Sequence, residues 1–502
     1  MDIDGSDDEG YSDLTAPHLV ERLSETQRAE VAVQLLLTVS CETLARVTDR
    51  LVPLTKRDFV AWLPMELGVK ILSFVGSSLC ASASALGLWV GEDRPSLGHA
   101  HSHAHFSGFA SLATCLRVSR SWAQVARDNA CWRAAFRAAW PRSFERVAPR
   151  PPSIVDSSEK KRSVTPVSTV GSSYDPAYID WKHVCLQRHL LDRNWRTGTY
   201  TATEIPTPHK EAIYCLQFDR DKIVSGSRDH TVRIHDAKTL QLRSTLVGHI
   251  GSVLCLQFDK TSLVTGSSDS RILIWSLPPL PSAGDPSAET TPSTIHPTHI
   301  LKGHTESVLN LKFDSSRILS CSKDKTIKVW SSVDGSLLRT LKGHRAAVNA
   351  VQFRGRLAVS ASGDRTIKVW DLETGENMRT LVGHVRGIAC VQFEGDLIVS
   401  GSSDKTIRIW NVHTGQHLRT LDGHMELVRT LQFDESIIVS GSYDQSIKVW
   451  DMKSGSQLLA LDAHRHRVFK VQFNECRIVS CSQDQRIIVW DFTSGVDTSF
   501  FN

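Results

Sequence analysis

A histidine recurs at a nearly constant interval through the C-terminal part of the chain. Successive positions are 40 residues apart, except for one step of 55. The seven positions are His209, His249, His304, His344, His384, His424 and His464. Each is followed nine residues later by a phenylalanine, from Phe218 in the first unit to Phe473 in the last. A fixed period of this length indicates one repeated structural unit, and it limits the possible architecture more than any other feature of the chain.

Two further positions recur inside each unit. A short Ser-rich stretch ends in an aspartate, at Asp229, Asp269, Asp324, Asp364, Asp404, Asp444 and Asp484. Six residues later there is a tryptophan, at Trp275, Trp330, Trp370, Trp410, Trp450 and Trp490. His235 takes this place in the first unit. Runs such as TIKVW and IIVSGS are rich in β-branched residues and bounded by turns, as strands are.

Units of about 40 residues with four short strands and these signatures are typical of propeller blades. The sequence therefore predicts an all-β, seven-bladed propeller over residues 196–495, preceded by an α-helical region. Residues 197–205 are expected to supply the outer strand of the last blade and so to close the ring. The extra residues of the longest step lie in the Pro/Ser-rich stretch 277–294, which we predict to be a surface loop.

The repeated His and Asp residues could be interpreted as a metal site or an acid–base array. A site that is used once would not be repeated seven times, so we interpret them as scaffold, joined to Ser/Thr and Trp in a hydrogen-bonded tetrad within each blade. We expect no metal and no cofactor. No nucleophile–base set, Gly-rich phosphate loop or metal-ligand spacing stands out from the repeat, so we do not expect an enzyme.

The N-terminal half contains two segments that resemble the halves of an F-box. In the first, FVAWLPMELGVKILSFVGSSLC (59–80), Leu63 and Pro64 open a helix, since proline is tolerated in a first turn. Leu67, Ile71 and Leu72 share one face of that helix. Val118 and Trp122 mark helix faces in the second segment, 116–136. A generic helical bundle is the alternative interpretation. Residues 81–113 intervene as an insertion, and their alternating histidines are more typical of a loop than of a functional metal site.

Composition divides the rest of the chain. The expected parts are an acidic disordered N-terminus over 1–24, a helical segment that could dimerise over 25–58, the F-box over 59–136, a disordered linker over 137–177, a connecting helix over 178–195 and a tail over 496–502. A net charge of +4 does not indicate a nucleic-acid partner, and no apolar stretch is long enough to span a membrane. Eleven scattered cysteines without a CxxC pair favour a reducing compartment, the cytoplasm or the nucleus.

An F-box followed by seven WD blades resembles the beta-TrCP (Slimb) family. Strings such as GSVLCLQF, RGIACVQF and ELVRTLQF carry this resemblance through the propeller, and KRDFVAWLP resembles the end of that family's dimerisation helices. The resemblance implies a non-catalytic substrate receptor of a ubiquitin ligase. Its partners would be a Skp-type adaptor with cullin and RING subunits, phosphorylated proteins and a second copy of the chain. The adaptor would bind the F-box residues Leu63, Pro64, Leu67, Ile71, Leu72, Val118 and Trp122.

Two positions in each unit do not repeat, namely the fourth before the phenylalanine and the one before the aspartate. We expect both to face the mouth of the central channel, where they would be available for specificity. With a few neighbours they supply Arg, Lys, Ser, Tyr and some apolar side chains, and no Asp or Glu. This mixture suits a doubly phosphorylated peptide, because each phosphate carries nearly two negative charges and has acceptor oxygens for Arg and hydroxyl groups.

The resemblance also implies the degron, Asp-phosphoSer-Gly-x-x-x-phosphoSer, and its contacts. The first phosphate would meet Tyr214, Arg228, Ser252 and Ser268, and the second would meet Arg386, Gly387 and Ser403. The degron aspartate would face Lys323, Arg429 and Tyr443. Its glycine and apolar part would lie over Leu309, Asn349, Ala389, Leu427, Arg467 and Phe469. Two alternatives stay open: a receptor with another specificity, of the division-cycle or sulfur-regulation type, and a WD scaffold without a ligase role.

Overall fold

The computed structural model describes residues 128–144, 147, 179–206, 209–277 and 293–500. They fall into two compact units, a helical one and a propeller, whose boundary lies after Arg188 and again before Thr498. The F-box residues named above, from Leu63 to Trp122, lie outside the described residues, as do the expected parts 1–24 and 25–58 and the insertion 81–113.

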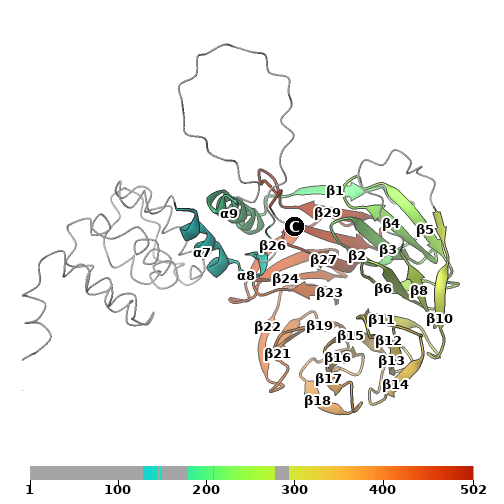
Figure 1. Ribbon diagram of the computed structural model, residues 1–502. Coiled ribbons are helices and arrows are strands. Elements are labelled where there is room, and N and C mark those ends of the chain that lie inside the picture. The colour runs from blue at the N-terminus through green and yellow to red at the C-terminus, as the bar shows by residue number, and fades with distance from the viewer. Residues whose placement is uncertain (1–127, 145–146, 148–178, 207–208, 278–292, 501–502) are drawn as a thin grey trace, which may run out of the picture. The chain divides into compact units, whose positions relative to one another are not determined.

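The propeller consists of seven antiparallel sheets, one for each sequence unit (Figure 1). The first blade contains β2 (Ile213–Phe218), β3 (Lys222–Ser227), β4 (Thr231–Asp236) and β5 (Leu242–Val247). The second contains β6 (Val253–Phe258), β7 (Ser262–Ser267), β8 (Ile272–Ser276) and β10 (Pro297–Leu301). The third contains β11 (Val308–Phe313), β12 (Arg317–Ser322), β13 (Ile327–Ser331) and β14 (Leu337–Leu341). Strand β9 (Ser293–Ile295) adds a fifth, parallel strand to the first blade by pairing with β5. The loop predicted over 277–294 therefore ends in a strand.

The remaining four blades follow the same order of strands. They contain β15 (Val348–Arg354), β16 (Leu357–Ser362), β17 (Thr366–Asp371) and β18 (Asn377–Val382); β19 (Ile388–Glu394), β20 (Leu397–Ser402), β21 (Ile407–Asn411) and β22 (His417–Leu421); β23 (Val428–Phe433), β24 (Ile437–Ser442), β25 (Ile447–Asp451) and β26 (Gln457–Leu461); and β27 (Val468–Phe473), β28 (Arg477–Ser482) and β29 (Ile487–Asp491). The predicted seven-bladed propeller is confirmed.

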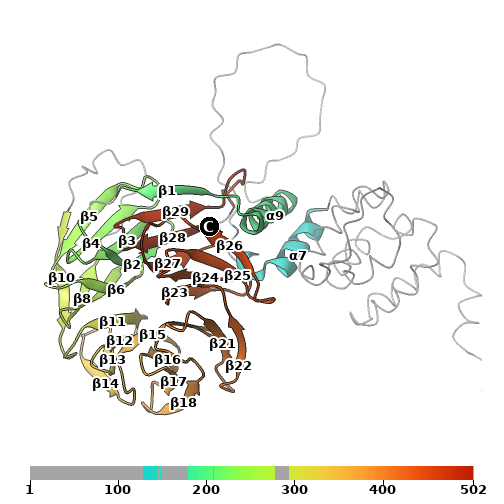
Figure 2. The ribbon, with the colours of Figure 1, turned by 180° about the vertical axis from the view of Figure 1, so that it is seen from behind.

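The ring closes through a strand from the other end of the propeller segment. β1 (Thr201–Ile205) is the outer strand of the last blade and pairs antiparallel with β29, with Ile205 opposite Ile487. Figure 2 shows β1 beside β29, as the sequence predicts. The first strand of each blade contacts the first strand of the next, and β27 contacts β2, so that these seven strands surround the axis.

The expected tetrad is present in six blades. In the third blade, Trp330 Nε1 donates to Ser320 Oγ at 2.8 Å, Ser320 Oγ lies 2.8 Å from His304 Nε2, and His304 Nδ1 lies 2.7 Å from Asp324 Oδ2. The scaffold interpretation of these residues is confirmed. Each aspartate also holds the turn that follows it, where the next residue, such as Lys325 with φ 69°, has a left-handed backbone.

The first blade departs from this pattern at His235. Its ring is fully buried where the other blades have tryptophan, and neither ring nitrogen has a hydrogen-bond partner in the described part of the chain. Burial lowers the pKa of His235 to about 4, so the ring is neutral near pH 7. The network of this blade therefore stops at Ser225, which bonds His209 Nε2 at 2.9 Å.

The helical unit is built from α7 (Asn129–Ala139), α8 (Pro141–Phe144) and the start of α9 (Trp181–Thr197). Asp128 caps α7 by accepting a hydrogen bond from Ala130 N–H. Trp132, Phe136 and Trp181 form the core of this unit. No helix among the described residues is long and apolar enough to cross a membrane.

Three expected boundaries need adjustment. Helical structure continues to Phe144, so a disordered linker does not begin at residue 137; the reason is that Trp140 and Phe144 pack on the helical core. Phe500, in the predicted tail, is only 4% exposed and belongs to that same core. The helix expected over 178–195 is observed as α9, and its second half packs Trp195 flat on Phe492 at a centroid distance of 3.9 Å.

Candidate peptide-binding face and central channel

One backbone hydrogen bond, present in every blade, brings the two variable positions together. The residue before the repeat aspartate donates its N–H to the carbonyl of the third residue after the repeat histidine, as Arg228 donates to Ala212 O at 2.9 Å and Ser403 to Gly387 O at 2.9 Å. The start of each innermost strand therefore lies beside the turn after the second strand. All sixteen residues of the predicted degron site lie on these segments, at one end of the propeller, which we call the channel face.

Most of the predicted site residues are accessible on this face. Arg228, Ser268, Lys323, Arg386 and Arg467 are exposed. Partly exposed are Tyr214, Ser252, Leu309, Asn349, Gly387, Ser403, Leu427, Arg429 and Tyr443. Ala389 and Phe469 are buried, because they lie further down the innermost strands. The channel face thus offers three exposed arginines, a lysine and several hydroxyl groups to a ligand.

Three aromatic rings from neighbouring blades form an arc at the channel mouth. The ring centroid of Phe469 lies 4.9 Å from that of Tyr214 and 5.9 Å from that of Tyr443. The guanidinium of Arg467 stacks over Tyr443 at 4.9 Å from the ring centroid. This contact holds the cation against an apolar surface, which orients it without a carboxylate partner.

Two glycines allow close approaches on this face. A Cβ at Gly387 would lie 3.2 Å from the Cα of Gly363 in the neighbouring blade, which is tighter than ordinary contact. A Cβ at Gly251 would lie 2.6 Å from Ser268 Oγ. A side chain at either position would displace its neighbour, so glycine is what allows these segments of the channel face to pack closely.

Carboxylates also lie on the channel face, which the sequence analysis missed. Glu211 pairs with Arg228 at 3.1 Å, and Glu306 pairs with Lys323 at 3.1 Å. Both glutamates are the second residue after the repeat histidine, where Arg386 lies in another blade. The second position after the repeat histidine also varies among the units, and this variation in the sequence indicates that its side chains belong to the same face.

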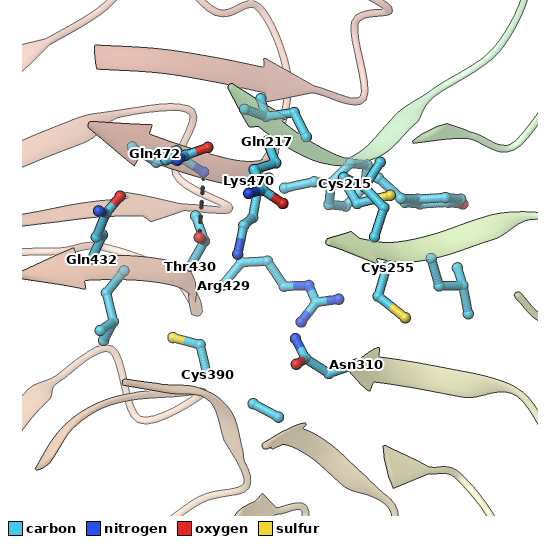
Figure 3. Close-up of a pocket in the computed structure, with 18 of the residues that line it drawn as sticks. Cys215, Gln217, Cys255, Asn310, Cys390, Arg429, Thr430, Gln432, Lys470 and Gln472 are labelled. Atoms are coloured by element: carbon cyan, nitrogen blue, oxygen red, sulfur yellow. Dashed lines mark hydrogen bonds between the residues drawn. The ribbon is translucent and has the colours of Figure 1, made fainter. Parts of the chain in front are cut away.

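The channel below this face is a cavity of about 180 Å³ lined by the seven innermost strands. Six blades contribute a glutamine, the eighth residue after the repeat histidine. In most of these blades the glutamine bonds to the next blade, as Gln217 does when its Nε2 donates to Phe258 O at 3.0 Å and its Oε1 accepts from Phe258 N–H at 2.7 Å. The third blade has Lys312 at this position. Arg429 and Lys470 also reach into the channel from β23 and β27 (Figure 3).

The channel cysteines are not reactive groups. Burial raises the pKa of the Cys215 and Cys390 thiols to about 12, so both stay protonated near pH 7. Cys215 Sγ lies 3.7 Å from Val253 O of the next blade, as expected of a weak thiol donor. Among the described residues no group of His, Cys, Asp and Glu is arranged to hold a metal ion.

The comparisons agree with this architecture. The family of the WD domain, G-beta repeat, matches residues 201–236, 240–276, 295–331, 335–371, 375–411, 415–451 and 455–491, just over half of the chain. The crystal structure of the WD40 beta propeller domain of Doa1 has a TM-score of 0.51 and 26% identity, and the match covers 58% of this chain and 97% of that one.

Curated relatives carry F-box and ligase names. The chain is 36% identical over 258 residues to the F-box/WD repeat-containing protein lin-23 of Caenorhabditis elegans, which is 46% of this chain and 33% of that protein. It is 29% identical over 193 residues to the probable E3 ubiquitin ligase complex SCF subunit sconB of Arthroderma otae, covering 37% and 24%. The chain thus spans a third or less of these relatives' length. It belongs to the WD40-repeat family.

Proposed function

We propose that this chain is a non-catalytic substrate receptor of a Skp–cullin–F-box ubiquitin ligase, active in the cytoplasm or nucleus. Its ligands would be phosphorylated proteins with a degron of the beta-TrCP type, Asp-phosphoSer-Gly-x-x-x-phosphoSer. One observation carries the proposal: two positions that vary from blade to blade meet on the channel face, where they and their neighbours place Arg228, Arg386 and several hydroxyl groups on one surface. The names of the curated relatives support a role in such a ligase.

The channel face suits two phosphates rather than one. Arg228 belongs to the first blade, and Ser252 and Ser268 belong to the second blade beside it. Arg386 and Ser403 belong to the fifth blade. A phosphate bonded to an arginine fork and a hydroxyl gains charge-assisted hydrogen bonds, which are roughly twice as strong as neutral ones. The arc of Tyr214, Phe469 and Tyr443 would pack against the apolar part of the peptide.

The receptor would act by positioning. A substrate held on the channel face and an adaptor held by the F-box would place substrate lysines near the ubiquitin-charged enzyme, which raises their effective concentration. The adaptor contacts would come from Leu63, Pro64, Leu67, Ile71, Leu72, Val118 and Trp122. A dimer through residues 25–58 would present two such sites.

The peptide half of the proposal is tested with the full chain and a doubly phosphorylated Asp-Ser-Gly-x-x-x-Ser peptide. We expect phosphate-dependent binding that Arg386→Ala weakens by about 1.5–3 kcal/mol, the range for hydrogen bonds to charged groups. The matched control is Arg354→Ala, an exposed arginine at the opposite end of its blade, which should leave binding unchanged. Equal affinity for the phosphorylated peptide and its unphosphorylated twin would rule out a phosphodegron receptor.

The adaptor half is tested by a pull-down with a Skp-type adaptor. The double substitution Leu63→Ala with Pro64→Ala should abolish capture of the adaptor and leave phosphopeptide binding intact. Wild-type capture by this variant would contradict the F-box assignment. If the unmodified chain captures no adaptor but binds the phosphopeptide, a WD scaffold without a ligase role becomes the better account.

A further inference from the structure

Three cationic side chains line the central channel without a matching anionic group. They are Lys312 on β11, Arg429 on β23 and Lys470 on β27. No Asp or Glu lines the cavity, and among the described residues none of the three cations has a carboxylate within 4 Å. Arg429 Nη1 makes one long bond, 3.4 Å, to Ala389 O. The side-chain ammonium groups of Lys312 and Lys470 have no hydrogen-bond partner in the described part of the chain.

Lys470 is close enough to each of the other two cations for their charges to interact. Burial and the neighbouring charge of Lys470 lower the pKa of Lys312 to about 8. Burial also lowers the pKa of Lys470, and Arg429 contributes to that lowering. Unpaired charges in a confined space are costly, and an anion between them would offset both the desolvation and the repulsion.

The cavity has room for such an anion. Its volume of about 180 Å³ is far above the ~10–15 Å³ that one water molecule requires in this measure. Asn310, which is on β11 as Lys312 is, also lines the cavity and can donate a hydrogen bond from its side-chain amide to an anion (Figure 3). The surrounding thiols of Cys215 and Cys390 are neutral, so they do not compete for the cations.

We propose that the central channel binds one small oxyanion from solution, of the size and charge of inorganic phosphate or sulfate, between Lys312, Arg429 and Lys470. The bound ion would offset part of the positive charge of the interior and link the third blade, through Lys312, to the adjacent sixth and seventh blades. Lys312 and Lys470 lie in the channel below the channel face, whereas Arg429 is also assigned to the degron aspartate in the proposed function; no peptide is needed to fill the anion site.

The chain itself offers substitutions that remove the site without disturbing the scaffold. Lys312→Gln restores the glutamine that six blades have at this position, and Lys470→Thr introduces the residue that the preceding blade has at Thr430. A separate double variant, Arg228→Ala with Arg386→Ala, removes cations of the channel face and keeps the channel. It controls for phosphate bound at the surface.

Inorganic phosphate is titrated into the full chain by calorimetry, and thermal unfolding is followed at constant ionic strength with chloride as the reference salt. Wild type should bind one phosphate per chain, and the melting temperature should rise with phosphate concentration. The Lys312→Gln, Lys470→Thr variant should bind at least about tenfold more weakly, as expected for the loss of charged hydrogen bonds. The channel-face variant should respond like wild type.

Sulfate serves as the probe for pH, because its charge does not change between pH 7 and pH 9. Sulfate binding should weaken as the pH rises above about 8, where Lys312 loses its proton. An equal phosphate response in wild type and in the channel variant would overturn the proposal, because only the general salting effect of these ions would then remain. Loss of the response in the channel-face variant would also overturn it.

Discussion

Arg228 and Lys323 each meet a carboxylate that the degron must displace, with its phosphate at Arg228 and with its aspartate at Lys323. The Arg228–Glu211 pair is well exposed, with side-chain exposures of 62% and 49%. Exposed pairs of this kind contribute about 0–1 kcal/mol, so a phosphate with nearly two charges can displace the glutamate. The glutamate nevertheless opposes phosphate binding, and it disfavours acidic peptides that lack a phosphate at this position.

Glu211→Gln should therefore strengthen binding of the doubly phosphorylated peptide. We expect a gain of roughly two- to fivefold, the equivalent of about 0.5–1 kcal/mol, because the competing charge is removed while Arg228 stays in place. Titration of the labelled peptide at low ionic strength measures it. Glu373→Gln is the control, since Glu373 pairs with Arg356 at the other end of its blade. Weaker binding by the Glu211 variant would mean that this glutamate orients Arg228 rather than competing for it.

At the scale of the element, each blade depends on its buried aspartate. In the fourth blade, Asp364 accepts hydrogen bonds from His344 Nδ1, Arg345 N–H and the hydroxyl of Thr366. Burial alone would raise the pKa of Asp364, but these hydrogen bonds lower it to about 2. The hydrogen bonds of the blade thus stabilise the ionised form of this carboxylate.

Asp364→Asn should destabilise the propeller by about 1–3 kcal/mol at pH 7, because an amide cannot accept all of these hydrogen bonds. Unfolding in denaturant measures the loss, and Asp396→Asn, on an exposed pair with His413, should cost far less. The pKa of Asp364 is lower in the folded than in the unfolded chain. Its contribution is therefore complete above about pH 4 and is lost as the pH falls towards 2, so the two proteins should converge in acid.

At the scale of the whole molecule, stability depends on how the ring is closed. The last blade has only three strands from its own unit, and β1 supplies the fourth from the start of the propeller segment. Ile205 at the end of β1 is 1% exposed and packs with Ile213, Val479 and Ile487. One side chain therefore joins the first and last blades.

Ile205→Ala should lower the free energy of unfolding by about 2–5 kcal/mol, as for other large-to-small changes in cores. Thr203→Ala, exposed on the same strand, should have little effect. Thermal unfolding compares the two variants, and hydrogen exchange locates the loss. If β27, β28 and β29 exchange faster than the strands of the other blades, the variant opens first in the last blade, where β1 closes the ring. Uniform loss across all blades would show that the ring unfolds as one unit.

The sequence alone determined the scaffold, because the same residue types recur wherever the local environment recurs. The histidine, aspartate and tryptophan of each unit, the seven blades and the closing strand were all predictable from spacing and alternation. The positions of the channel face were predictable as well, since they are the ones that do not repeat. Their assignment to particular phosphates stays a prediction.

Only the tertiary structure decided which groups meet outside the repeated pattern. The pairing of Glu211 with Arg228, the meeting of Lys312, Arg429 and Lys470 in the channel, and the burial of Phe500 join residues far apart in sequence or outside the repeat's signature. Local patterns specify strands and turns. Charges and rings from different blades become neighbours only when the ring closes, and their energies depend on that geometry.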